Sequence, residues 1–398
     1  MLINNTYHVT YCSNIHPGKD WETTFENLKT HVPKIKNEIS KNTPFGIGLR
    51  LSNKASEELQ IDDNLLDFKT WLSDNDCYVF TMNGFPYGSF HNTIVKDQVH
   101  SPDWTTKERL VYTKRLFDQL QLLLPEGVSG GISTSPISYK HWFKSDESIT
   151  NAFTKGAEHL SEIAIQLYDI EQHSGKYMHL DIEPEPDGLI ENTKEFLDFY
   201  NDYLIPVAES ILTLKLKLDK AEAAHIIKRY ITLCYDVCHF SLAFEDPKYT
   251  FEATKKEGIT VGKIQVSAAL KILFEKGQEK DIWNSLERFD ESTYLHQVTE
   301  KTDGKVTVYN DLPVVLREKK SHKELRAHFH VPIFLEKFDN LYSTQDQILK
   351  TLEYLKTDVV STHLEVETYT WDVLPQTLKQ DIAQSILREL KWLKDKLK

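Results

Sequence analysis

The sequence has few cysteines. Only Cys12, Cys77, Cys234 and Cys238 occur in 398 residues, too few and too scattered for a disulfide framework in a chain of this length. Each lies in or beside an apolar, strand-like run, so we expect reduced cysteines in the core. Cys234 and Cys238 have no second Cys/His pair at a suitable spacing, which argues against a structural zinc site there.

The sequence also lacks long hydrophobic runs. No stretch approaches the roughly 18 consecutive apolar residues that a membrane helix needs. The first residues, MLINNTYH, have neither a basic region nor a following apolar segment, so no secretory signal is recognised. We therefore expect a cytoplasmic protein without direct membrane insertion.

Basic residues are in the minority, with 47 Lys and Arg against 60 Asp and Glu and a formal net charge of −13. Binding along a nucleic-acid backbone needs clustered positive charge to displace counterions. Nucleic acid is thus an improbable main partner, and a small-molecule metabolite is the expected ligand.

A Gly-x-Gly-x-x-Gly turn after a strand is also missing, which argues against a dinucleotide-binding fold. Instead, eight short apolar runs alternate with longer amphipathic stretches along the whole chain, as in a parallel α/β protein. Eight strand–helix units favour a closed (β/α)₈ TIM barrel, and we expect residues 1–398 to form one such domain. The predicted strands are 7–14, 45–51, 78–83, 128–134, 177–183, 230–236, 263–267 and 361–368.

Residues 270–342 do not fit this repeat. Runs at 294–298 and 306–309 flank Asp303-Gly304, which predicts a β-hairpin, and a further strand-like run covers 325–334. We interpret the segment as an elaborated insertion between the seventh and eighth units, where it would help to shape the active-site mouth. Residues 376–398 predict a final amphipathic helix.

Carboxylates and histidines follow the strand periodicity. In the fifth strand His179, Asp181 and Glu183 share one face, and in the eighth His363, Glu365 and Glu367 do so. Unpaired buried charges are costly, so clustered acids at strand ends imply a compensating partner.

The sixth strand ends in Asp236, and His239 follows three residues later. One such pair alone is more often structural than functional. Together with Glu183 and Glu365, however, it places acids at or near the C-terminal ends of several strands, where barrel active sites lie. Oxygen and imidazole donors in that arrangement suit a divalent metal: Mn²⁺, Mg²⁺, Zn²⁺ or Fe²⁺.

Further ligand-binding candidates stand at the ends of the second and third strands. Arg50 and Asn83 are polar strand ends, and the loop from Asn83 to His91 contains two glycines, a proline and three aromatic residues. Asn83 and His91 could hydrogen-bond a hydroxylated ligand. The aromatic Phe85 and Tyr87 either stack on a ligand or wedge the loop against the barrel, and both interpretations stay open.

At these residues the sequence resembles the xylose isomerase-like barrels, which include sugar isomerases, ketose epimerases and endonuclease IV. Within that superfamily it most resembles the barrel proteins of the Ebo metabolite-traffic operons. The resembling segments are YCSNIHPG at 11–18, NGFPYG at 83–88, HLDIEPEP at 179–186, DVCH at 236–239, HFHVP at 328–332 and HLEVETY at 363–369.

The resemblance implies ligand roles. Epimerase-like members hold their metal with a Glu, an Asp, a His and a second Glu, and by position Glu183, Asp236 and Glu365 take the acidic roles. Gln265 stands where the histidine ligand is expected, so either Gln265 binds a hard metal, His330 supplies the nitrogen, or the metal site has decayed. His239 takes the substrate-contacting role, and Glu185 is a candidate for proton transfer.

Three functions remain open at this point. The first is a metal-dependent isomerase or epimerase-like enzyme that acts on a small hydroxylated metabolite. The second is a non-catalytic binding or hand-over protein in metabolite traffic, with other traffic proteins as partners. The third, a phosphodiester-cleaving enzyme like endonuclease IV, is disfavoured by the net charge and by the small number of histidines that can be placed.

Overall fold

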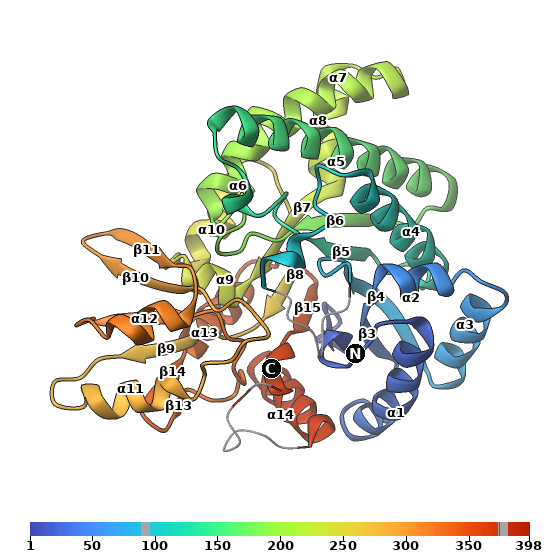
Figure 1. The fold of residues 1–398 in the computed structure, drawn as a ribbon. Coiled ribbons are helices and arrows are strands. Elements are labelled where there is room, and N and C mark those ends of the chain that lie inside the picture. The colour runs from blue at the N-terminus through green and yellow to red at the C-terminus, as the bar shows by residue number, and fades with distance from the viewer. Residues whose placement is uncertain (89–95, 373, 375–380) are drawn as a thin grey trace.

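Eight parallel strands form the barrel that the sequence predicts (Figure 1). The computed structural model describes residues 1–88, 96–372, 374 and 381–398. The sheet runs in the order β2-β15-β8-β7-β6-β5-β4-β3, with the short β1 (Leu2–Ile3) antiparallel to β2. The barrel strands are β2 (Tyr7–Tyr11), β3 (Phe45–Arg50), β4 (Cys77–Asn83), β5 (Gly130–Thr134), β6 (Met178–Ile182), β7 (Ile231–Asp236), β8 (Val261–Val266) and β15 (His363–Val366).

The barrel closes between β2 and β3 through a side chain. The Thr10 hydroxyl donates to the Gly46 carbonyl at 2.7 Å and accepts from the Gly48 amide at 3.0 Å. An isolated parallel bridge joins Cys12 to Gly48. The contact between β2 and β3 that closes the barrel is therefore short, and a side chain makes part of it.

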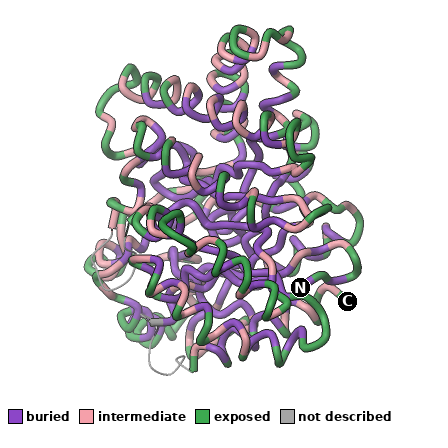
Figure 2. Tube along the Cα trace, turned by 90° about the vertical axis from the view of Figure 1, so that its right-hand side faces the viewer, coloured by how far each residue is buried: buried purple, intermediate pink, exposed green. Residues whose placement is uncertain are grey.

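Helices surround the strands, so that buried residues concentrate in the interior and exposed ones outside (Figure 2). Among the described residues, no helix combines the length and hydrophobicity that crossing a bilayer requires. The helices outside the insertion are α1 (Trp21–Ile39), α2 (Asn53–Glu58), α3 (Asn64–Asp74), α4 (Lys107–Leu123), α5 (Asp146–Ser174), α6 (Thr193–Phe199), α7 (Ile205–Leu216), α8 (Lys220–Tyr230), α9 (Val237–Leu242), α10 (Pro247–Lys256), α13 (Gln345–Leu355) and α14 (Ile382–Lys396).

Helix α1 shows how the sequence specifies these elements. The Asp20 side chain accepts from the Thr23 amide and caps the helix start. Leu28, Val32 and Ile35 are fully buried at spacings of four and three residues, as an amphipathic helix requires. The predicted final helix is also present as α14, although the predicted residues 376–380 lie outside the described part of the chain.

The insertion forms a second, entirely antiparallel sheet beside the barrel (Figure 1). It lies between β8 and α13, where the sequence predicts it. Its strand order is β11-β10-β12-β9-β14-β13, and α11 (Glu279–Glu287) and α12 (Leu312–Glu318) accompany it. The strands are β9 (Leu270–Leu273), β10 (Val298–Thr302), β11 (Lys305–Tyr309), β12 (Glu324–Ala327), β13 (Lys337–Phe338) and β14 (Leu341–Ser343).

The predicted hairpin turn is confirmed, but its first strand was placed too early. Asp303 and Gly304 both have positive φ, 50° and 80°, as a tight two-residue hairpin turn needs. The first strand is Val298–Thr302 rather than 294–298, because it pairs with Lys305–Tyr309 directly across the turn. The run predicted at 325–334 is strand only as far as Ala327.

The barrel interior contains buried charges, and glycines make room for them. Lys263 of β8 forms an ion pair with Glu365 of β15, and both side chains are fully buried. A Cβ atom on Gly48 would lie 1.8 Å from Glu365 Oε1, and one on Gly262 would lie 2.0 Å from Asp181 Oδ1. These two positions admit only glycine without rearrangement.

Helix α14 packs a buried carboxyl group against the barrel, with a consequence for pH dependence. Glu389 accepts from Thr368 Oγ1 at 2.7 Å and from the Ile333 amide at 3.2 Å. Burial raises the pKa of Glu389 to about 7. Because the folded-state pKa exceeds the unfolded one, the wild type loses stability as pH rises from the unfolded pKa toward 7, by at most about 3 kcal/mol.

We expect Glu389→Gln to remove this loss. In urea denaturation, the unfolding free energy of the variant relative to wild type should be higher at pH 8 than at pH 5. The exposed Glu353, replaced in the same way, serves as control and should show no such difference. An equal pH dependence in wild type and Glu389→Gln would refute the expectation.

Candidate metal centre

Three acidic side chains converge at the C-terminal ends of the barrel strands. Glu183 directly follows β6, Asp236 ends β7, and Glu367 follows β15. One carboxylate oxygen of each lies within 4.8 Å of those of the others, and all three residues are buried. We call Glu183, Asp236 and Glu367 the carboxylate cluster. Such proximity of buried acids requires positive charge or protons.

Asp236 is held in place by the start of α9. Its Oδ1 accepts from the His239 amide at 3.0 Å and from Ser267 Oγ at 2.7 Å. Burial opposes ionisation, but the nearby His239 and His330 outweigh it, and the pKa of Asp236 is lowered. Its Oδ2 is buried and has no hydrogen-bond partner. Asp236 therefore offers one oriented carboxylate oxygen to the cluster.

Glu367 is fixed by three side-chain amides. Oε1 accepts from Asn14 Nδ2 at 2.7 Å and from Asn83 Nδ2 at 2.8 Å, while Oε2 accepts from Gln265 Nε2 at 2.7 Å. Burial, followed by the charges of Asp236 and Glu365, raises the pKa of Glu367. The three donors orient a carboxylate whose surroundings otherwise disfavour its charge.

Glu183 completes the cluster with an atom that nothing in the protein satisfies. Burial is the main cause that raises the pKa of Glu183, and the charges of Glu367 and Asp236 add to it. Glu183 Oε2 is buried without a hydrogen-bond partner. An unsatisfied buried acceptor is rare in proteins and marks a position where an ion or water belongs.

His330 brings a nitrogen to the same place from the loop after β12. Its Nδ1 donates to the Glu367 carbonyl at 2.8 Å, so Nε2 carries the lone pair. Nε2 is buried without a partner, and one nitrogen of His330 groups within 4.8 Å with ligand atoms of Asp236 and His239. His330, one of the residues considered for the nitrogen ligand, thus lies close to Asp236 of the carboxylate cluster.

Of two further predicted ligands, Glu365 lies deeper in the barrel and Gln265 contacts the carboxylate cluster through Glu367. Glu365 pairs in register with Gln265, two residues before Glu367, and therefore sits one layer deeper in the barrel. There Glu365 forms the ion pair with Lys263, and Gln265 binds Glu367 and the Cys234 thiol. Among the described residues, Glu365 belongs to no group of His, Cys, Asp and Glu side chains that could hold a metal ion. Glu367 rather than Glu365 thus lies close to Glu183 and Asp236, since strand parity gives the face of a residue but not its depth.

The predicted catalytic residues line one cavity with Glu183 and Glu367 of the carboxylate cluster. His239 donates from Nδ1 to the Pro184 carbonyl at 3.1 Å, and Glu185 Oε1 lies 2.9 Å from His100 Nε2. Residues of the insertion form part of the cavity wall. Its lining includes Asn14, Asn83, Phe85, Pro86, Lys96, Val99, His100, Glu183, Glu185, His239, Tyr294, Leu295, Gln297, His328, His330, Glu367 and Tyr369.

The three residues predicted to bind substrate differ in their position relative to the cavity. Asn83 lines the cavity, while its side chain also holds Glu367. Arg50 does not line it: the buried guanidinium donates to the carbonyls of Gly18, Pro86 and Gly88 and so fixes the loop. His91 lies outside the described residues. Of the two aromatic residues left open, Phe85 lines the cavity, whereas Tyr87 packs against Tyr112.

Several cavity residues escaped the sequence prediction. Glu367 shares a strand face with Glu365 and was recognisable as an alternative ligand. His328 forms a His-x-His pair with the predicted His330, and the location of this pair depends on how the insertion folds. His100 and Tyr294 come from segments with no periodic signal at all.

Comparisons with known proteins identify the fold. No family model and no curated protein matches the sequence. A D-tagatose 3-epimerase-like protein superposes with a TM-score of 0.51 at 11% identity, covering 98% of this chain and 97% of that one. A xylose isomerase-like TIM-barrel protein from Mycobacterium smegmatis, in complex with magnesium, has a TM-score of 0.51 at 10% identity, with 100% and 98% covered. The chain therefore has the fold of the xylose isomerase-like TIM barrels.

Proposed function

We propose that this protein is a divalent-metal-dependent, isomerase- or epimerase-like enzyme acting on a small hydroxylated metabolite. The observation that carries the proposal is two overlapping groups of buried ligand atoms, Glu183 with Asp236 and Glu367, and Asp236 with His239 and His330. Glu183, Asp236 and His330 each also have a buried side-chain atom without a hydrogen-bond partner. Three carboxylates and one imidazole suit Mn²⁺, Fe²⁺, Zn²⁺ or Mg²⁺. The donor set thus fits a resident metal.

The metal would be held by the carboxylate cluster and His330. When bound, it would polarise a carbonyl or hydroxyl oxygen of the metabolite as a Lewis acid. The amides of Asn14, Asn83 and Gln265 orient Glu367, and the Glu367 carbonyl fixes the His330 ring. Such supporting contacts keep ligands in place before the metal binds.

The protein's own groups would handle the substrate and its proton. His239 and Glu185 line the cavity next to the carboxylate cluster. Glu185 is paired with His100, so a proton taken up by the carboxylate can be shared with an imidazole. His239 faces the same space and can hydrogen-bond a substrate hydroxyl. Phe85 and Tyr369 provide apolar walls that limit access of water.

The reaction can be tested without knowing the substrate. Purified protein supplied with Mn²⁺ is incubated in D₂O with a panel of aldoses, ketoses and hydroxy ketones, and NMR detects deuterium at the carbon beside the carbonyl. We expect metal-dependent exchange with at least one compound, reduced at least about 1000-fold in Asp236→Asn. Exchange that persists in this variant or without metal would contradict the proposal.

A binding or hand-over role remains the second candidate, motivated by the resemblance to the Ebo barrel proteins and by the engagement of Gln265 with Glu367. In that case other metabolite-traffic proteins would be the partners. A compound that stabilises the protein thermally but shows no exchange at any metal concentration would favour this role over the enzyme.

A further inference from the structure

Helix α14 brings a buried carboxyl group to two segments of the candidate metal centre. Glu389 Oε1 accepts a hydrogen bond from Thr368 Oγ1 at 2.7 Å and from the Ile333 amide at 3.2 Å. Thr368 directly follows Glu367, and Ile333 comes three residues after His330. One oxygen atom of α14 therefore joins the segment that carries Glu367 to the segment that carries His330.

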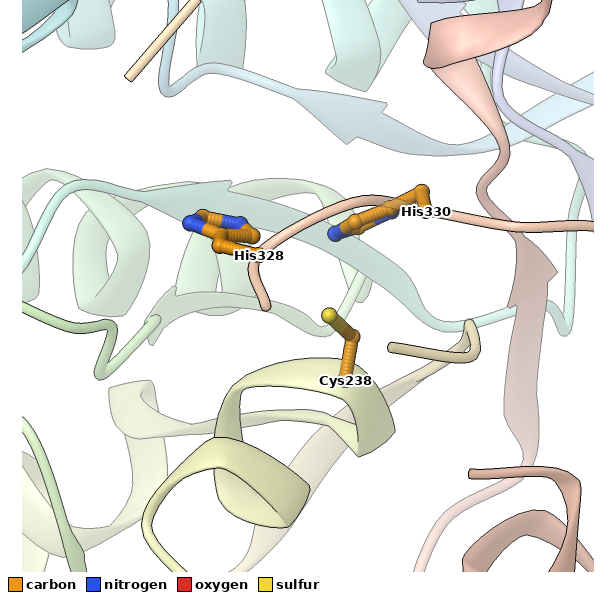
Figure 3. A group of neighbouring side chains, drawn as sticks. All are labelled: Cys238, His328 and His330. Atoms are coloured by element: carbon orange, nitrogen blue, oxygen red, sulfur yellow. The ribbon is translucent and has the colours of Figure 1, made fainter. Parts of the chain in front are cut away.

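The same two segments are also bonded to each other. His330 Nδ1 donates to the Glu367 carbonyl at 2.8 Å, and Thr370 Oγ1 donates to the His330 carbonyl at 2.6 Å. The His330 ring is thereby directed toward His328 and the Cys238 side chain of α9 (Figure 3). The position of His330 Nε2 thus depends on how closely the two segments are held together.

Helix α14 is a firm support for this contact. Leu390 and Leu393 are fully buried and three residues apart, so one face of the helix packs into the interior. The Arg388 guanidinium lies over the Phe334 ring, 4.1 Å from its centroid, and adds a second contact between α14 and the segment after His330. A group that is held by helix packing can fix the position of a loop.

The Glu389 carboxyl group does not serve stability alone. It is 1% exposed, and burial raises its pKa to about 7, so the folded protein disfavours the ionised form. An apolar side chain would avoid this cost, but it would leave the Thr368 hydroxyl and the Ile333 amide without their acceptor. Buried acids that lower stability are typical of functional sites, which favours a role in the nearby centre.

We propose that Glu389 is a positioning residue of the candidate metal centre, which holds the segments of Glu367 and His330 at the distance that lets both side chains reach one ion. The inference rests on the proposed function, because the ion is the one assigned to the carboxylate cluster. Glu389 does not line the cavity, and it acts through the Thr368 hydroxyl and the Ile333 amide.

Hydrogen–deuterium exchange of the metal-free protein tests the first step. Full-length wild type, Glu389→Leu and Glu389→Gln are stripped with chelator, and mass spectrometry follows the peptides that contain Ile333. Leucine removes the acceptor, so we expect the Ile333 amide to exchange about 10-fold faster. Glutamine keeps an acceptor oxygen at the same place, and its peptides should exchange as those of wild type do.

Titration of the same proteins with Mn²⁺, followed by electron paramagnetic resonance, tests the second step. We expect Glu389→Leu to bind Mn²⁺ about 10-fold more weakly than wild type, and Glu389→Gln to stay within about 2-fold. Leu393→Ala is the matched control, because it weakens the packing of the same helix and keeps the Glu389 side chain. Its Mn²⁺ affinity should equal that of wild type.

The outcomes separate this inference from the proposed function. If wild type binds no Mn²⁺, the proposed function fails and the inference fails with it. If wild type binds Mn²⁺ and Glu389→Leu shows unchanged exchange or unchanged affinity, only the positioning role is overturned. An equal loss of affinity in Glu389→Leu and Leu393→Ala would also overturn it, because the loss would then follow from a loosened helix.

A second pair of variants covers the case in which Glu389→Leu does not fold. Thr368→Val removes one of the two donors to Glu389 at nearly constant side-chain size, whereas Thr368→Ser keeps the hydroxyl. We expect weaker Mn²⁺ binding in Thr368→Val alone, and equal affinities in the two variants would contradict the positioning role.

Discussion

Replacing Lys263 with Met is expected to lower the free energy of unfolding by about 3–5 kcal/mol. The ammonium group is fully buried against Glu365 and also donates to Ser133 Oγ at 3.3 Å. Burial by itself lowers the pKa of Lys263, but the adjacent Glu365 carboxylate reverses the direction and raises it. Removing the cation leaves Glu365 as a buried charge without its partner. Chemical denaturation of the purified variant measures the loss.

The double variant Lys263→Met/Glu365→Leu is the control. It removes both charges and fills the space with apolar atoms, so most of the lost stability should return. If the double variant is as unstable as Lys263→Met, the unpaired Glu365 carboxylate is not the cause of the lost stability.

Replacing Glu367 with Gln is expected to weaken metal binding at least about 100-fold. The carboxylate would become an amide at the centre of the cluster, and its NH₂ group would face one of the three amide donors that now hold Glu367. Titration with Mn²⁺, followed by calorimetry, measures the affinity of wild type and variant.

The same double variant, Lys263→Met/Glu365→Leu, provides the matched comparison. It also removes a strand-face acid from β15, but one that is absent from the candidate metal groups of the described residues. We expect its metal affinity to stay within a few-fold of wild type. A large loss in the double variant with little change in Glu367→Gln would restore Glu365 as the ligand.

The barrel itself could be predicted because its signal is local and repeated. Each strand is a short apolar run, and each helix between them has an apolar stripe, as Leu28, Val32 and Ile35 show in α1. The position of the insertion was also predictable, because a hairpin with an Asp303-Gly304 turn does not fit a parallel repeat. These features depend on a few neighbouring residues.

The site could be predicted only in part, because depth in a barrel is not a local property. Glu365 and Glu367 share a face, and alternation cannot tell which one reaches the mouth. The tilt of the strands and the partner on the next strand decide it, and Lys263 on β8 lies beside the deeper acid. Such pairing depends on contacts between residues about 100 positions apart.

The sequence analysis names His330 as a possible nitrogen ligand, but the position of the loop that carries His328 and His330 could not be predicted. Alternation through 325–334 treated His328 and His330 as strand residues, but the strand ends at Ala327. The following backbone turns toward the barrel, with the His328 amide bound to the Gln297 carbonyl and the Val331 amide to the Ala268 carbonyl. Tertiary contacts of the insertion set these positions, and no local pattern encodes them.

The antiparallel sheet of the insertion separates two chemical tasks that many metal sites combine. The eight-stranded barrel carries the carboxylate oxygens of the cluster, and the loop that leaves β12 carries the softer nitrogens of His328 and His330. If a metal binds there as proposed, substitutions in this loop would shift its preference between magnesium-like and zinc-like ions while the barrel that folds around the acids stays unchanged.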